Sequence, residues 1–113
     1  KGMNYLEMTP FRKHSERISS GGIVTVLVPR FSNRFVSRLL SRSMPDPWIH
    51  TELDEIGSHV WLAIDGRQPV SGIIKNVSAD LGDKVHPATE RITQFLTQLY
   101  RSGFISFKEL TER

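Results

Sequence analysis

Apolar and polar residues follow a strand-like pattern in the first part of the chain and helical spacing in the second half. Residues 23–28, Ile-Val-Thr-Val-Leu-Val, are nearly all β-branched, a composition that is typical of a strand. Gly21-Gly22 before this segment and Pro29 after it predict a turn and a stop. A weaker strand-like pattern over residues 8–18 predicts another strand, which precedes residues 23–28 and forms a hairpin with them.

A third strand is predicted at residues 48–53, Trp-Ile-His-Thr-Glu-Leu. Its short length and the neighbouring prolines suit a strand at the edge of a sheet. Three helices are predicted to follow, over residues 54–64, 69–81 and 87–102. The second and third begin at prolines, which are preorganised for the first helical turn, and all three end at a glycine.

The order of these elements predicts an α+β fold, in which a three-stranded antiparallel sheet is followed by a three-helix bundle. With 113 residues the chain is long enough for one core and too short for two, so we expect residues 3–113 to form a single domain. Residues 104–107 are expected to return as an extended segment over that core. Trp61, Phe95 and Phe107 are expected to serve mainly as core residues.

Residues 30–47 stand between the second and third predicted strands as an insertion. Arginines recur there at every fourth position, so a helix over this stretch would carry an arginine stripe beside apolar residues. The stripe consists of Arg30, Arg34, Arg38 and Arg42. It is a candidate contact with a partner enzyme or an anionic membrane surface, and a solvated basic face is the alternative. The insertion could also cover the edge strand of a neighbouring subunit in a homo-oligomer.

Residue types that support catalysis are sparse. The sequence contains no cysteine, which excludes disulfides, thiolate metal sites and a cysteine nucleophile, and which suits a cytoplasmic protein. No stretch approaches the roughly 18 consecutive apolar residues of a membrane span. The histidines form no pair at metal-binding spacing, and no phosphate-binding glycine loop occurs. We therefore expect no enzyme, no metal and no cofactor.

Several short motifs follow one another from residue 58 onward. They are His59-Val60-Trp61-Leu62-Ala63-Ile64-Asp65-Gly66, Pro69-Val70 with Ile73-Ile74, and Arg91-Ile92 leading to Gly103-Phe104-Ile105. In this order and spacing, over about residues 48–107, the chain resembles the PqqD family, the pyrroloquinoline quinone biosynthesis protein D group.

This resemblance implies three strands and three helices in an arrangement similar to a winged helix. It also implies a peptide chaperone, which binds the leader of a ribosomally made precursor peptide and presents it to a modifying enzyme, commonly a radical S-adenosylmethionine enzyme. In related domains the peptide adds as a strand to the edge of the third strand and lies against the third helix. An edge strand suits this mode because it offers backbone hydrogen bonds. By position, the predicted peptide-binding residues are Trp48, Ile49, His50, Thr51, Glu52, Arg91, Gln94, Phe95 and Gln98.

Nucleic-acid binding by a winged helix is the alternative function. The net charge of +3 is unevenly distributed, because residues 1–50 carry eight Lys or Arg and three Asp or Glu, whereas residues 51–113 carry seven and nine. In a winged helix that binds DNA, the third helix would enter a groove of the DNA. Here the third predicted helix belongs to the acidic part of the chain. This distribution disfavours nucleic acid, and a membrane is disfavoured as a partner as well.

Overall fold

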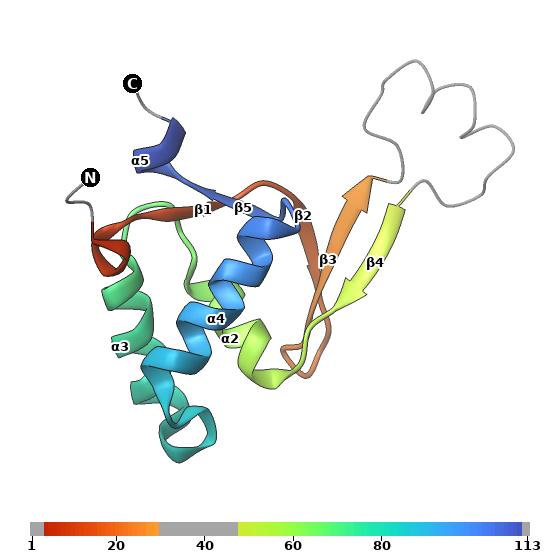
Figure 1. The fold of residues 1–113 in the computed structure, drawn as a ribbon. Coiled ribbons are helices and arrows are strands. Elements are labelled where there is room, and N and C mark those ends of the chain that lie inside the picture. Colours follow the sequence, from red (N-terminus) through yellow and green to blue (C-terminus); the bar gives the residue numbers. More distant parts are fainter. Residues whose placement is uncertain (1–3, 30–47, 112–113) are drawn as a thin grey trace, which may run out of the picture.

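The computed structural model describes residues 4–29 and 48–111, which form short strands followed mainly by helices (Figure 1). The elements are η1 (Tyr5–Glu7), β1 (Pro10–Arg12), β2 (Ser15–Ile18), β3 (Val24–Pro29), β4 (Trp48–Glu52), α2 (Glu55–Ala63), α3 (Val70–Leu81), η2 (Gly82–Val85), α4 (Ala88–Arg101), β5 (Ile105–Phe107) and α5 (Lys108–Thr111). The arginine stripe, with the helix that would carry it over residues 30–44, and the rest of the insertion lie outside the described residues.

The main sheet has three antiparallel strands in the order β2-β3-β4. Val26, at the centre of β3, pairs with Glu16 on one side and with Thr51 on the other. The helices α2, α3 and α4 gather beside this sheet, and the β3-β4 hairpin extends past them (Figure 1). The predicted α+β class, with its three-stranded antiparallel sheet, is confirmed, while the similarity to a winged helix stays a prediction.

The turn between β2 and β3 lies where the two glycines predicted it. Gly22 has φ +83°, a conformation that glycine adopts without the steric penalty of a Cβ. The Ser19 hydroxyl oxygen accepts the N–H of Ile23 at 3.1 Å, and the Ser19 N–H donates to the Ile23 carbonyl at 2.9 Å. These bonds close the hairpin and set the register of β2 against β3.

The segment predicted as one strand over residues 8–18 is two strands with different partners. Only β2 pairs with β3, whereas β1 pairs antiparallel with β5, with Pro10 opposite Phe107. The Lys13 N–H donates to the Phe104 carbonyl at 2.9 Å and extends that second pairing. The prediction of one strand was wrong because β5 lies far away in the sequence, and local periodicity carries no information about so distant a partner.

The three main helices begin and end close to their predicted limits. Asp54 is the N-cap of α2, and its Oδ1 accepts the Gly57 N–H at 2.7 Å. Pro69 and Pro87 are the N-caps of α3 and α4, with ψ angles of 171° and 118°. Because the backbone at these prolines is extended rather than helical, both helices begin one residue later than predicted. Gly82 follows α3 with φ +57°.

One core joins the sheet to the helices. Its fully buried members include Val24 and Val26 from β3 and Trp61 from α2. The buried Ser58 hydroxyl accepts the Val24 N–H at 2.8 Å and ties α2 to β3. Trp61 and Phe107 are core residues as predicted, but Phe95 is only partly buried. Phe95 is therefore available to a surface site.

Candidate functional site

β4 lies at an edge of the main sheet, since β3 is its neighbour in the described strand order β2-β3-β4. The Leu53 N–H donates to the Val24 carbonyl at 2.8 Å. Because amide groups alternate along an antiparallel strand, those of Thr51 and Ile49 also point toward β3. The N–H and carbonyl of Glu52 then point away from β3. The predicted edge strand thus directs backbone groups outward, away from the sheet.

The side chains of β4 alternate between two faces of the sheet. Ile49 and Thr51 stand opposite Val28 and Val26, on the face that packs against the helices. Ile49 nevertheless remains 43% exposed. An apolar side chain is therefore accessible on the helix-facing side of the edge strand.

A groove of about 450 Å³ lies between the end of β4, the start of α2 and the side of α4. Its lining residues are Glu52, Leu53, Asp54, Ile56, Gly57, Arg91, Phe95 and Gln98. The groove brings together four of the predicted peptide-binding residues, Glu52 from β4 and three from α4. The other members, at the start of α2, were not predicted as site residues. The sequence pointed to this part of the groove only through Gly57, because a glycine inside a predicted helix often marks a close packing contact.

Gly57 determines how closely α4 approaches this groove. A Cβ at position 57 would stand 3.1 Å from Phe95 Cζ and 3.3 Å from Leu53 Cβ. The glycine thus leaves room for the Phe95 ring, which lies over the start of α2. Phe95, Leu53 and Ile56 supply the apolar part of the groove.

The groove carries charges of both signs. Arg91 donates through Nη1 to the Lys84 carbonyl at 3.1 Å, while Lys84 Nζ is paired with Glu55 at 3.3 Å. Within residues 4–29 and 48–111, neither Arg91 nor Glu52 belongs to an ion pair. The guanidinium of Arg91 is therefore able to meet a negative charge on a ligand.

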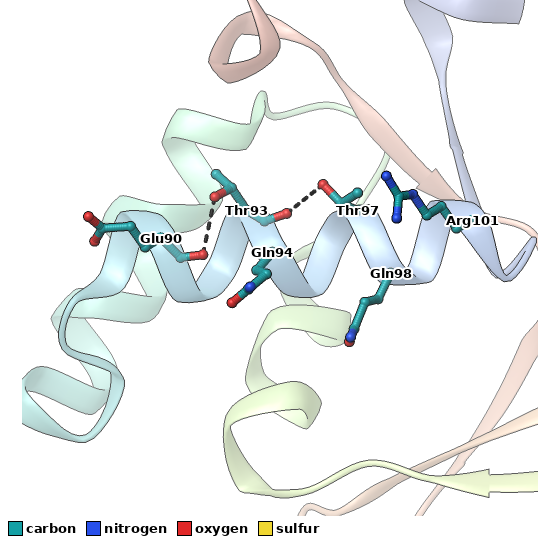
Figure 2. A pocket seen from close by; sticks show the side chains of 6 residues that line it. All are labelled: Glu90, Thr93, Gln94, Thr97, Gln98 and Arg101. Atoms are coloured by element: carbon teal, nitrogen blue, oxygen red, sulfur yellow. Dashed lines mark hydrogen bonds between the residues drawn. The ribbon is translucent and has the colours of Figure 1, made fainter.

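Gln94 lies outside this groove, on the outer face of α4. Figure 2 shows it in a neighbouring open hollow of about 500 Å³, together with Gln98. The complete lining of this hollow is Glu90, Thr93, Gln94, Thr97, Gln98 and Arg101. The Thr93 hydroxyl bonds to the Glu90 carbonyl at 3.2 Å, and the Thr97 hydroxyl donates to the Thr93 carbonyl at 2.8 Å. The Thr97 hydroxyl also lies 3.3 Å from the Tyr5 hydroxyl, within hydrogen-bonding distance. Both threonines are thus engaged by protein groups, and the hollow is an open surface with polar side chains.

A further polar hollow of about 380 Å³ lies at the end of α2. Its charged groups are satisfied by protein partners: Arg12 pairs with Glu16 at 3.2 Å and donates to the Ile64 carbonyl at 2.7 Å. Glu16 also accepts the Trp61 Nε1–H at 3.2 Å. Backbone N–H groups, first of Gln68 and then of Arg67, lower the pKa of Asp65. These interactions stabilise the connection after α2.

The described ranges were also compared with the requirements of a metal site and of a membrane-spanning helix. No group of three His, Cys, Asp or Glu side chains there is arranged to hold a metal ion. No helix there has the length and apolar character needed to cross a bilayer.

The fold and groove define an α+β unit with an edge strand beside an exposed helix. The family model described as Coenzyme PQQ synthesis protein D (PqqD) matches residues 46–105, more than half of the 113-residue chain. The chain therefore belongs to the PqqD family, and the predicted resemblance is confirmed. No curated protein and no solved structure matches it.

The matched region contains β4, α2, α3 and α4, and thus every residue that lines the groove. Membership supports an accessory role in the biosynthesis of pyrroloquinoline quinone or of related ribosomally made peptide products, in a family of non-catalytic accessory proteins.

Proposed function

We propose that this protein binds the leader of a ribosomally made precursor peptide and presents it to a modifying enzyme, of the radical S-adenosylmethionine type. The peptide adds as an extended strand beside β4 and lies against α4. The observation that carries this proposal is the groove, in which Glu52 of β4 meets Arg91, Phe95 and Gln98 of α4.

The chemistry of the groove supports a peptide as its occupant. The outward N–H and carbonyl of Glu52 are able to continue a backbone ladder with an added strand. The apolar wall formed by Phe95, Leu53 and Ile56 offers a place for one of its side chains. Main-chain bonds supply affinity in this mode, and side-chain contacts supply specificity.

Nucleic-acid binding gains no support from α4. Its basic residues are Arg91 and Arg101, and Glu90 adjoins the first of them. Arg91 faces the groove rather than the outer face, so α4 presents no basic surface for phosphate contacts.

The test uses immobilised wild-type protein and two variants, each exposed to a peptide extract of the native host. Phe95→Ala removes the apolar wall, and Leu62→Ala truncates an exposed apolar residue outside the groove. Retained peptides are identified by mass spectrometry, synthesised, and titrated by calorimetry. Circular dichroism checks that each variant is folded.

We expect a peptide that binds the wild type and Leu62→Ala alike and binds Phe95→Ala about tenfold more weakly, since a buried aromatic contact at an interface commonly contributes this much. The same peptide should be modified faster by its enzyme when the wild-type protein is added. Equal affinity for all three proteins would exclude the groove as the site. Retention of no peptide would exclude the function.

A further inference from the structure

The groove has an acidic side and a basic side. Glu52 lines it from the end of β4, Asp54 from the connection to α2, and Arg91 from α4. Asp54 is engaged in capping α2, and Lys84, beside Arg91, is already paired with Glu55. Arg91 therefore supplies the positive charge that remains for a ligand in the groove.

The spacing of groove residues on α4 fits alternate side chains of an extended peptide. Arg91 and Phe95 are four residues apart, which corresponds to about 6 Å along a helix axis. Side chains on one face of a strand repeat about every 6.6 Å. In the view of Figure 1, α4 and β4 run along similar directions with opposite chain sense. A strand added beside β4 therefore lies along α4 rather than across it.

We infer that the groove selects peptides that carry an aspartate or glutamate two residues away from a large apolar side chain. The apolar side chain packs against Phe95, and the carboxylate pairs with Arg91. This inference rests on the proposed function and narrows its substrate class to leaders with such an acidic and apolar pair.

Arg101 offers a matched control for Arg91. Both are exposed arginines of α4, but Arg101 lies in the outer hollow rather than in the groove (Figure 2). Arg91→Glu and Arg101→Glu thus make the same change of charge on the same helix. A difference between them reports the position of the charge and not the net charge of the protein.

The probe is a phage-displayed library of random twelve-residue peptides, selected on the wild type, Arg91→Glu, Arg101→Glu and Phe95→Ala. We expect the wild type and Arg101→Glu to enrich peptides with an acidic residue two positions from an apolar one. Arg91→Glu should enrich lysine or arginine at that position instead. A synthetic peptide selected on the wild type should bind Arg91→Glu about tenfold more weakly, since a favourable pair becomes a repulsive one. Replacing its acidic residue by lysine should restore the binding.

The outcomes separate this inference from the function on which it rests. If the wild type and Arg91→Glu enrich the same peptides, and Phe95→Ala fails to bind them, the charge pairing is wrong and the peptide site stands. If Phe95→Ala also enriches them, the groove is not the peptide site. If the wild type enriches no peptide, both the inference and the proposed function fail.

Discussion

Phe95 lies so close to Gly57 that a Cβ on the glycine would stand 3.1 Å from the Phe95 ring. The contact joins the start of α2 to the middle of α4, and both residues line the groove beside β4. A helix position without a side chain thus determines where the apolar wall of the candidate peptide site stands.

Replacing Gly57 by alanine should weaken peptide binding roughly tenfold, because the added methyl displaces the Phe95 ring from its place in the groove. Stability should change by less than about 1 kcal/mol, since the higher helix propensity of alanine offsets part of the crowding. The matched control is Gly72→Ala in α3, where the atom closest to the new Cβ is the flexible end of Gln68. Calorimetric titration with a bound peptide compares the two, and equal weakening would contradict the packing argument.

Ser58→Ala should destabilise the protein by about 1–3 kcal/mol, because the Val24 N–H would lose its buried acceptor. Urea unfolding followed by circular dichroism measures this loss. Ser71→Ala, at an exposed position on α3, is the control and should shift stability by less than about 0.5 kcal/mol. A Ser58 variant as stable as that control would show that the bond between α2 and β3 contributes nothing.

Glu109 should make the stability depend on pH. Hydrogen bonds from the Thr9 N–H at 2.8 Å and from its hydroxyl at 3.1 Å lower the pKa of Glu109 below its ordinary value of 4.5. A lowered folded-state pKa stabilises the protein above the unfolded value, and this stabilisation is lost as the pH falls through the folded value. Wild type should therefore exceed Glu109→Gln in stability at neutral pH, and the difference should vanish in acid.

Urea unfolding of both proteins between pH 7 and pH 3 checks that prediction. Glu7→Gln is its control, since the Glu7 side chain makes no hydrogen bond with any residue in the described ranges. A difference between wild type and Glu109→Gln that is constant with pH would contradict the assigned role of the carboxylate.

The proposed backbone ladder predicts an alternating response to N-methylation of a bound peptide. In an antiparallel or parallel strand, successive amides point to opposite sides. Methylation of an amide that faces β4 should lower the affinity about tenfold through loss of the bond and steric exclusion, whereas methylation of its neighbour should have little effect. Titration with a series of singly methylated peptides measures the pattern. Uniform effects along the series would indicate that the peptide does not bind as a strand.

The sequence alone predicted the elements that depend on local chemistry. Gly22 before β3 and Gly82 after α3 lie at the predicted turn and helix end, since glycine tolerates the positive φ values found there. Helical periodicity located α2, α3 and α4 to within one or two residues. The motifs from residue 58 onward indicated the family that the matching model then showed.

The composition of the groove was only partly predictable. The family resemblance predicted Glu52, Arg91, Phe95 and Gln98 as site residues, and the structure brings these four together in the groove. It also predicted Gln94, which the structure places in the outer hollow. These two glutamines lie one helical turn apart on the same side of α4. Sequence spacing alone does not reveal where the wall of the groove ends, because that depends on how α4 packs against α2.

Local signals thus determined which segments form strands, turns and helices. These signals are β-branched residues, the positions of proline and glycine, and helical periodicity. The tertiary structure decided which of these segments meet: β1 with β5 across almost the whole chain, and Gly57 with Phe95 at the groove. The physical reason is that secondary structure is favoured by neighbours within a few residues, whereas packing is decided by the shapes of surfaces that the sequence places far apart.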